Sequence, residues 1–340
     1  MSIRLKYIYR KTADFFSIEN IFDQLAGQIG ISPTYEIEKA YLPCRGLSIR
    51  SILQNRKFIK GLDADVFHIT GDVHYTALFL PRRKTILTVH DCVFMYRNKG
   101  IKRWMLQQWL LRWPVSRCSI VTTISERTKK DIAEFTGCPE DKIVVIPNPV
   151  NEKIGFIQKS FNSRKPVLLF IGTTPNKNLG RTIAAIRGVS CTLVIIGRLP
   201  EEDLQLLVTS AIDFVNLFNL SEAEIIKAYN DADIVLFPST FEGFGLPVIE
   251  GQRAGRVVIT SNISPMKEVA GDAACLVDPL NTESIRNGII KVITDNEYRE
   301  HLIERGLINA TRFGLKEISR QYSALYTQLI DSKGCVELQA

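Results

Sequence analysis

Short apolar segments alternate with longer amphipathic segments along the chain, and this alternation starts twice. A polar stretch with little periodicity, Asn151–Lys165, separates the two series. Strand-length apolar runs that alternate with helix-length stretches are typical of parallel α/β sheets, because each crossover has to return the chain to the same sheet edge. We therefore predict strands at Leu5–Tyr9, Val66–Ile69, Thr85–Val89, Ile120–Ile124 and Lys142–Ile146, and again at Val167–Ile171, Leu193–Ile196, Phe214–Leu217, Ile234–Phe237, Val257–Thr260 and Ala274–Val277.

Two domains are expected, because 340 residues exceed the length of a typical single domain. The predicted fold class is α/β, with two Rossmann-like domains that face a central cleft. Residues 1–150 form the first domain, 151–165 the linker and 166–296 the second domain. Helices in 297–332 are expected to pack back towards the first domain. Ligands of such sheets bind beyond the carboxyl ends of the strands, so the predicted cleft is the expected binding site.

Composition and charge narrow the class of protein. The seven cysteines are dispersed without a CxxC pair, which indicates reduced thiols in the cytoplasm. The first residues carry scattered charges and predict no secretory signal, and no run reaches the ~20 apolar residues of a membrane-spanning helix. The net charge of +7 is concentrated in the first half, which favours an anionic partner. No recognised nucleic-acid-binding module accompanies this charge, so nucleic acid is not expected.

A basic cluster that begins at Lys99 precedes Trp104, Trp109 and Trp113 within Ile101–Trp113. Two interpretations remain open for this segment. It is either an amphipathic helix that rests at the inner face of the cytoplasmic membrane, or a core helix with a solvated basic edge.

The most informative segment runs from Phe237 to Glu250. An apolar strand ends at Phe237, a loop with Gly243 and Gly245 follows, and a proline stands where a helix would begin. Glycines let the backbone approach a ligand closely, and the amides that open a helix attract a diphosphate. Glu242 lies in the loop and Glu250 in the helix, and carboxylates accept hydrogen bonds from vicinal hydroxyls.

These residues resemble the group-1 family of retaining GT-B glycosyltransferases, whose E-x-F-G-x-x-x-x-E pattern is matched from Glu242 to Glu250. The resemblance spans roughly Val66–Val277, which makes it more specific than one motif. It also includes four further segments: Thr88–Asp91, Thr123–Thr128, Leu169–Asn178 and Ser261–Pro279.

The resemblance implies three catalytic residues. His90 would meet the donor sugar, Glu242 would contact donor-sugar hydroxyls near the reacting centre, and Lys177 would neutralise the leaving diphosphate. Ordinary structural roles are the alternatives: a loop-capping histidine, a cap carboxylate and a solvated lysine.

The resemblance also implies a set of substrate-binding residues. Glu250 would bind the ribose hydroxyls, and the loop backbone would hold the diphosphate and sugar. Gly172 opens the second-domain phosphate loop, and Arg198 is a second candidate for phosphate neutralisation because no arginine follows Gly172 closely. The full set is Gly172, Arg198, Gly243, Phe244, Gly245, Leu246 and Glu250.

No metal and no cofactor are expected. Two DxD strings, Asp63–Asp65 and Asp231–Asp233, precede apolar strands and therefore lie at the sheet edge opposite the ligand. We interpret both as helix-to-strand turns.

The first domain departs from the family pattern, since Tyr9–Glu19 holds no glycine pair after the first strand. Arg10 or Lys11 is expected to contact phosphate there. Asp72 and Asp91 both remain candidates for the acceptor base, and two histidines, His68 and His74, flank the loop that contains Asp72.

The predicted function is transfer of a hexose from GDP-mannose or a UDP-sugar to a lipid-linked or oligosaccharide acceptor, in cell-surface polysaccharide (lipopolysaccharide) biosynthesis. The Glu-Gly-Phe-Gly-Leu-Pro form is frequent among mannosyltransferases. The alternative is a catalytically inactive nucleotide-sugar-binding subunit. A dinucleotide-dependent oxidoreductase is not expected, because neither first-strand loop carries GxGxxG. We expect a cytoplasmic protein, either free or peripheral on the membrane.

Overall fold

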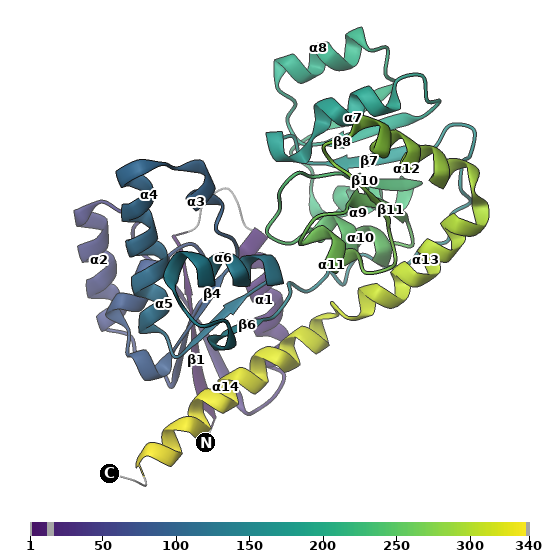
Figure 1. Ribbon diagram of the computed structural model, residues 1–340. Coiled ribbons are helices and arrows are strands. Elements are labelled where there is room, and N and C mark those ends of the chain that lie inside the picture. The colour runs from purple at the N-terminus through teal and green to yellow at the C-terminus, as the bar shows by residue number, and fades with distance from the viewer. Residues whose placement is uncertain (1, 12–16, 338–340) are drawn as a thin grey trace. The chain divides into compact units, whose positions relative to one another are not determined.

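The computed structural model describes residues 2–11 and 17–337. The chain divides into two compact units (Figure 1). The first comprises Met1–Pro149 together with Leu315–Ala340, and the second comprises Val150–Gly314. Each unit has its own buried apolar core.

The first unit is built on a six-stranded sheet whose paired strands are all parallel. Its order is β2-β1-β3-β4-β5-β6. The predicted strands are present, but β2 was missed because its alternating polar residues are largely exposed at the sheet edge. The strands are β1 (Ile3–Tyr9), β2 (Tyr35–Tyr41), β3 (Val66–Ile69), β4 (Thr85–Val89), β5 (Ile120–Thr123) and β6 (Ile143–Val145).

Helices and short helical turns connect these strands. They are α1 (Ser17–Ile29), α2 (Ile49–Lys60), η1 (His74–Phe79), η2 (Arg82–Lys84), α3 (Val93–Arg97), α4 (Gly100–Leu106), the π-helix η3 (Gln107–Arg112), α5 (Trp113–Arg117), α6 (Glu126–Thr136) and η4 (Glu140–Lys142). Within the described residues, no helix combines the length and the apolar character that crossing a membrane requires.

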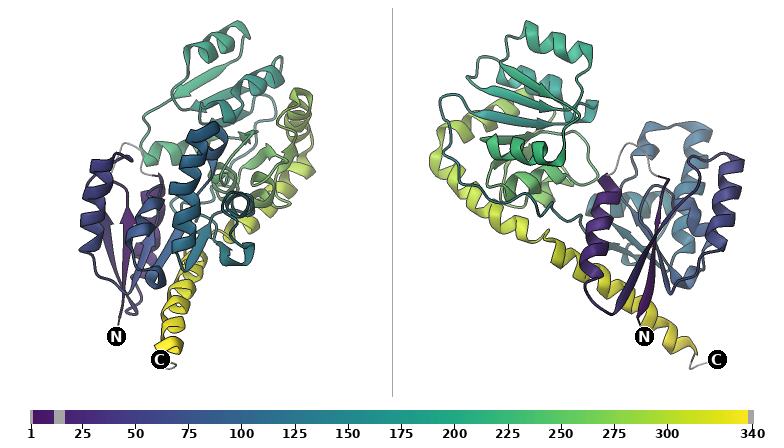
Figure 2. Two further views of the ribbon diagram at one scale, coloured as in Figure 1. Left: turned by 60° about the vertical axis from the view of Figure 1, so that its left-hand side comes forward. Right: turned by 180° about the vertical axis from the view of Figure 1, so that it is seen from behind.

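The last helix, α14 (Leu315–Glu337), belongs to the first unit and packs along α1 (Figures 1 and 2). A buried polar network fixes it there. The Tyr326 hydroxyl lies 2.8 Å from His68 Nδ1 and 3.0 Å from the Tyr7 hydroxyl, while His68 Nε2 lies 2.7 Å from Thr88 Oγ1. Burial lowers the pKa of His68 to about 3, so this ring is neutral and serves the packing of α14.

The second unit contains another six-stranded parallel sheet, in the order β12-β11-β10-β7-β8-β9. All its strands were predicted, because buried strands of a parallel sheet read as continuous apolar runs. They are β7 (Val167–Ile171), β8 (Thr192–Ile196), β9 (Phe214–Leu217), β10 (Ile234–Phe237), β11 (Val257–Ser261) and β12 (Cys275–Val277). The helical elements are η5 (Pro175–Lys177), α7 (Leu179–Ile186), α8 (Glu201–Thr209), α9 (Glu222–Asp231), α10 (Leu246–Arg253), α11 (Met266–Ala270), α12 (Thr282–Thr294) and α13 (Asn296–Thr311).

The stretch 151–165 contains no helix or strand and is bound to the second unit. Arg253 Nε donates to the Ile154 carbonyl at 2.7 Å. The guanidinium of Arg299 stacks over the Phe161 ring at 3.9 Å. These contacts make the stretch a fixed part of that unit's surface.

Both DxD strings lie where α-helices lead into strands, as predicted. Asp63 forms an ion pair with Arg4 at 2.9 Å, and the Arg4 amide donates to Asp65 at 2.9 Å. Asp231 ends α9, and Asp233 accepts from the Val167 amide at 2.8 Å at the start of β7. These carboxylates therefore support the amino ends of the strands.

Candidate functional site

The strand order of the second sheet creates one position where neighbouring strands lead in opposite directions. From β7 the chain continues outward to β8 and β9, whereas from β10 it continues to β11 and β12 on the other side. The loops that leave β7 and β10 therefore diverge above the sheet, and this is where doubly wound sheets bind ligands. The two most informative sequence segments, Gly172–Asn178 and Pro238–Gly245, are these two loops.

Lys177 and Glu242 meet across this switch point. Lys177 Nζ lies 2.6 Å from Glu242 Oε1, and both side chains are mostly buried. Asn176 Nδ2 donates to the same carboxylate oxygen at 3.1 Å and to the Phe241 carbonyl at 2.9 Å. The Thr240 amide donates to the Asn176 carbonyl at 2.8 Å. The two loops are thus held together through both backbone and side chains.

Gly172 makes room for Lys177. Its φ is +90°, and an added Cβ would lie only 2.8 Å from Lys177 Cε and 3.1 Å from Lys177 Cγ. The lysine stem therefore folds directly against the Gly172 backbone. Its ammonium also lies 4.7 Å from the centre of the Phe237 ring, a cation–π contact.

Gly245 begins α10 with φ +116°, and a proline stands in the first turn. A left-handed turn of this kind is costly for any residue other than glycine. Phe244 is buried edge-on against Phe313 at 5.8 Å, so its side chain anchors the loop. Gly243 and Leu246 flank the turn. The backbone amides of 244–246 thus lie at the positive end of the helix dipole.

Glu250 lies one turn into α10 and contacts Tyr229, the side chain that sequence reasoning missed. The Tyr229 hydroxyl donates to Glu250 Oε2 at 2.5 Å. Burial raises the pKa of Glu250, and the hydrogen bond from Tyr229 opposes this shift. Tyr229 has the helical spacing of an ordinary core residue on α9, and no sequence signal pairs it with Glu250.

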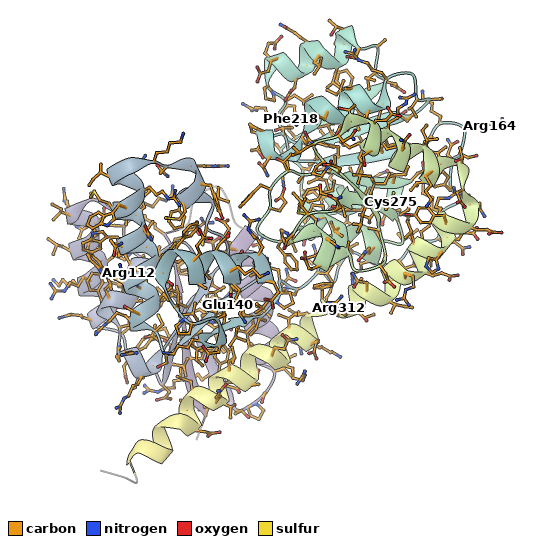
Figure 3. The ribbon with its side chains drawn as sticks, in the orientation of Figure 1. Arg112, Glu140, Arg164, Phe218, Cys275 and Arg312 are labelled. Carbon is orange, nitrogen blue, oxygen red and sulfur yellow. The ribbon has the colours of Figure 1, made fainter. Side chains whose placement is uncertain are left out.

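Arg198 follows β8 and touches the phosphate loop only through its backbone. Its carbonyl accepts from Thr173 Oγ1 at 2.7 Å. Its exposed guanidinium lies over the ring of Phe218, 5.6 Å from the ring centre. Phe218 directly follows β9 (Figure 3). Arg198 is therefore not brought into contact with Lys177 or Glu242.

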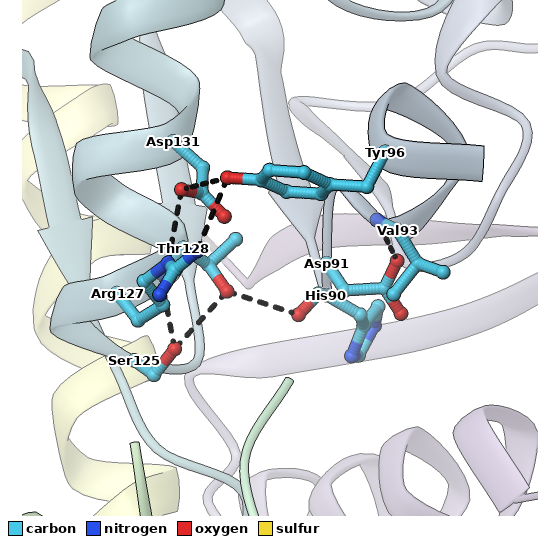
Figure 4. Close-up of polar contacts among 8 residues, drawn as sticks. All are labelled: His90, Asp91, Val93, Tyr96, Ser125, Arg127, Thr128 and Asp131. Atoms are coloured by element: carbon cyan, nitrogen blue, oxygen red, sulfur yellow. Dashed lines mark hydrogen bonds and ion pairs between the residues drawn. The ribbon is translucent and has the colours of Figure 1, made fainter. Parts of the chain in front are cut away.

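In the first unit, His90 follows β4 at the carboxyl edge of the sheet (Figure 4). Its Nε2 lies 2.8 Å from the Thr70 carbonyl, which can only accept, so Nε2 carries the proton. Burial lowers the pKa of His90, and the ring is neutral near pH 7. Nδ1 is left with a lone pair.

The two first-domain signatures of the sequence are joined through hydroxyl groups (Figure 4). Ser125 caps α6 by accepting from the Thr128 amide at 3.2 Å, and its hydroxyl donates to Thr128 Oγ1 at 3.0 Å. Thr128 Oγ1 in turn lies 3.5 Å from the His90 carbonyl. The segment Thr123–Thr128 thus supports the backbone of His90, a role that spacing alone did not indicate.

The remaining first-unit candidates lie close to this edge. Asp72 pairs with Arg10 at 3.1 Å, and Asp91 Oδ1 accepts from the Val93 amide at 2.9 Å. Lys11 is exposed, and residues 12–16 of the loop without a glycine pair lie outside the described residues. His74 Nδ1 lies 2.7 Å from the Leu110 carbonyl.

Comparisons with known proteins identify the class. Residues 29–153 match the family model described as Glycosyltransferase Family 4, and residues 152–307 match Glycosyl transferases group 1. HepE of Anabaena, solved in complex with UDP and glucose, has the same fold: the TM-score is 0.77 at 14% identity, covering 96% of this chain and 100% of HepE. Two parallel α/β sheets of this type define the GT-B fold.

The chain thus contains a Glycosyltransferase Family 4 domain in its first half and a group 1 glycosyltransferase domain in its second half. It is similar to O-antigen chain mannosyltransferase B of Escherichia coli, with 26% identity over 75% of this chain and 74% of that protein. It is also similar to O-antigen chain mannosyltransferase RfbU of Salmonella typhimurium, with 32% identity over 64% of this chain and 62% of that protein. The second match therefore covers less than two thirds of RfbU.

Proposed function

We propose that this protein is a retaining, metal-independent hexosyltransferase that acts in cell-surface polysaccharide biosynthesis. It transfers a hexose from a nucleoside-diphosphate sugar to a lipid-linked or oligosaccharide acceptor. The observation that carries the proposal is the Lys177–Glu242 pair at the switch point of the second sheet, beside the amino end of α10. A cation and helix amides suit a diphosphate, and a carboxylate suits the hydroxyls of the attached sugar.

Donor binding exchanges one partner of Lys177 for another. In the free protein its ammonium neutralises Glu242 at 2.6 Å. An arriving diphosphate competes for that ammonium and releases Glu242 to accept hydrogen bonds from sugar hydroxyls. The amides of Phe244, Gly245 and Leu246 hold the diphosphate, and Glu250 takes the ribose hydroxyls.

The reaction needs charge stabilisation at the leaving diphosphate more than any other assistance. Lys177 and the α10 amides supply it without a metal ion. Retention is proposed to follow from attack on the face that the diphosphate leaves, with a diphosphate oxygen taking the proton of the acceptor hydroxyl. Neutral His90 accepts a hydrogen bond from a donor-sugar hydroxyl through its Nδ1 lone pair.

GDP-mannose and UDP-sugars are the two donor candidates. The similarity to two O-antigen mannosyltransferases favours GDP-mannose. The fold shared with HepE, which was solved with UDP, favours a UDP-sugar. The same relatives support a glycan acceptor in O-antigen assembly.

Peripheral contact with an anionic membrane is part of the proposal. Trp104, Trp109 and Trp113 are 57%, 40% and 41% exposed on the segment α4–η3–α5, and Ile101 on the same segment is 75% exposed. These tryptophans lie on the exposed side of the segment, whose other side packs in the core of the first unit through Leu111 and Val115. Basic side chains such as Lys102 lie among the tryptophans, as in helices that rest at a lipid interface. Co-sedimentation with anionic but not with zwitterionic vesicles tests this contact.

The donor site is tested by thermal denaturation with UDP, GDP and ADP, each with and without a chelator. A ligand at ~100 times its dissociation constant stabilises the folded state by about 2.7 kcal/mol. We expect a shift with one nucleotide that the chelator leaves unchanged, that Glu250→Ala removes and that the exposed control Glu304→Ala retains. A shift that needs a metal contradicts metal independence, and no shift with any nucleotide contradicts the donor site. Hydrolysis of the nucleotide sugar separates an enzyme from an inactive binding subunit.

A further inference from the structure

The side chain of Tyr229 reaches Glu250 from the interior of the second unit. Tyr229 on α9 is completely buried, whereas Glu250 on α10 is partly exposed. The Tyr229 hydroxyl donates to Glu250 Oε2 at 2.5 Å, and no other hydrogen bond reaches this carboxylate from the described residues. Oε1 is not among the buried polar atoms that lack a partner, so solvent reaches it. One oxygen is thus held from inside, and the other is free to accept from a ligand.

Gln252, one half-turn further along α10, shows how a purely structural polar side chain is arranged in this helix. It is 1% exposed, and its Nε2 donates to the Ala270 and Ala273 carbonyls at 3.1 Å. Its Oε1 accepts from Asn309 at 2.8 Å. A neutral amide therefore satisfies all of its neighbours. Burying a carboxylate is more costly, and burial indeed raises the pKa of Glu250. A carboxylate with one internal hydrogen bond and one free oxygen is suited to bind a ligand.

Tyr229 is held at both ends. Its backbone carbonyl accepts from Arg256 Nε at 3.2 Å, and Arg256 Nη2 donates to the Ile157 carbonyl at 2.6 Å. Arg256 is only 4% exposed and bonds to the last turn of α9, where the helix dipole favours a cation. The position of the hydroxyl is therefore fixed. This donor in turn fixes the Glu250 side chain, which would otherwise sample several rotamers.

A carboxylate held in one orientation binds hydroxyl groups without the loss of side-chain entropy that ordering a mobile glutamate requires. The same arrangement disfavours a nucleotide that lacks the ribose hydroxyls, because Oε1 would then be covered without a partner. Sites built to hydrogen-bond a hydroxyl reject analogues without it for this reason.

We propose that Tyr229 is a positioning residue of the donor site: its hydroxyl holds Glu250 Oε2 so that Oε1 meets the ribose hydroxyls, which selects ribonucleotides over nucleotides without those hydroxyls. This inference rests on the proposed function and adds to it the residue that determines ribose selectivity. Tyr229 acts only through Glu250 and does not touch the nucleotide.

Titration calorimetry with UDP and GDP, and with the dideoxynucleotide form of each, tests the assignment. In the native protein we expect the preferred ribonucleotide to bind at least about tenfold more tightly than its dideoxy form, since a hydrogen bond to a charged group is lost. Tyr229→Phe keeps the buried ring and removes only the hydroxyl. We expect its Kd for the ribonucleotide to rise towards that of the dideoxy form, whose own Kd stays nearly unchanged. Tyr298→Phe, at the other tyrosine of Val150–Gly314, is the matched control and should keep the native selectivity.

A double-mutant cycle shows whether Tyr229 acts through Glu250. Once Glu250→Ala has removed the carboxylate, adding Tyr229→Phe should change the ribonucleotide Kd by less than about twofold. In sugar transfer, Tyr229→Phe should raise the donor KM and leave kcat nearly unchanged, because the ribose is bound equally in the ground state and in the transition state. A loss in kcat alone would contradict a role in ribose binding.

Glu250→Asp is a second variant that leaves Tyr229 in place. Its shorter carboxylate is withdrawn from the Tyr229 hydroxyl, so it should lose ribose selectivity as Glu250→Ala does. Native selectivity in either Glu250→Asp or Tyr229→Phe overturns the role of Tyr229 and leaves the proposed function intact. If the native protein binds ribonucleotide and dideoxynucleotide equally, or binds neither, the donor site assigned to Glu250 fails together with this inference.

Discussion

Replacing Gly172 by alanine tests the architecture of the phosphate loop. Gly172 adopts φ +90°, where a residue with a Cβ is strained by about 1–3 kcal/mol. The new Cβ would also lie 2.8 Å from Lys177 Cε, closer than real contacts allow. The lysine stem is flexible, so it should yield by moving away. We expect the second unit to lose about 1–3 kcal/mol of unfolding free energy.

The same displacement should weaken nucleotide binding. Lys177 Nζ is placed 2.6 Å from Glu242 by a stem that lies against Gly172, and moving the stem moves the charge. A charge-assisted hydrogen bond to the diphosphate is worth about 1.5 kcal/mol or more, so we expect the nucleotide Kd to rise at least about tenfold.

Thermal unfolding and titration calorimetry measure the two effects. About 1 kcal/mol corresponds to a fall in Tm of roughly 2–4 °C for a unit of this size. Gly180→Ala is the matched control, since Gly180 lies in α7 with nothing within 4 Å of an added Cβ. That variant should keep or gain up to about 1 kcal/mol and bind nucleotide normally. Equal Tm and Kd values for Gly172→Ala and the native chain would refute the packing argument.

Three other substitutions have distinct signatures. Glu250→Gln keeps an acceptor for the Tyr229 hydroxyl. Because burial raises the pKa of Glu250, the native protein loses stability as pH rises through that folded pKa, so the variant should gain stability relative to the native chain above pH about 4.5 while it loses nucleotide affinity. A difference in unfolding free energy between the two proteins, measured in urea, that stays constant with pH would contradict this. His68 has a folded pKa of about 3 against 6.5 when unfolded, so the unfolding free energy of the first unit should fall by about 1.4 kcal/mol per pH unit between pH 6.5 and 3. In His68→Gln this dependence of unfolding free energy on pH should be flatter. An unchanged dependence would show that other groups cause it. Thr128→Val should lower the unfolding free energy of the first unit by about 1 kcal/mol, because the hydroxyl bonds to Ser125 and supports the His90 carbonyl. It should also slow sugar transfer while nucleotide affinity stays intact, since this hydroxyl lies outside the donor site. Unaltered turnover would show that the support of His90 is dispensable.

The strands were the most predictable part of the fold. Buried parallel strands such as β7 and β10 are continuous apolar runs, and the sequence shows them directly. The edge strand β2 was missed because charged residues interrupt its apolar ones and only Ala40 is fully buried. The amphipathic α8 gives a similarly weak sequence signal, since only Leu207 of that helix is fully buried.

The candidate site was predictable where chemistry and backbone geometry share one local motif. The loop glutamate, the glycine turn and the lysine lie in two short segments, and the sheet order brings those segments together. Contacts between distant segments carried no such signal. Tyr229 with Glu250, Tyr326 with His68 and the Leu110 carbonyl with His74 each depend on tertiary packing, which a single sequence does not encode as spacing.

The configuration of the sugar linkage in the product tests the central claim most directly. The purified protein would be incubated with GDP-mannose or UDP-glucose, a chelator and a set of mannose oligosaccharides, and the new anomeric signals read by proton NMR. Both donors are α-linked, so a retaining, metal-independent transferase should form an α-linked product from one of them in the presence of the chelator. A β-linked product would contradict retention, and no product without added metal would contradict the metal-independent mechanism assigned to Lys177 and the α10 amides.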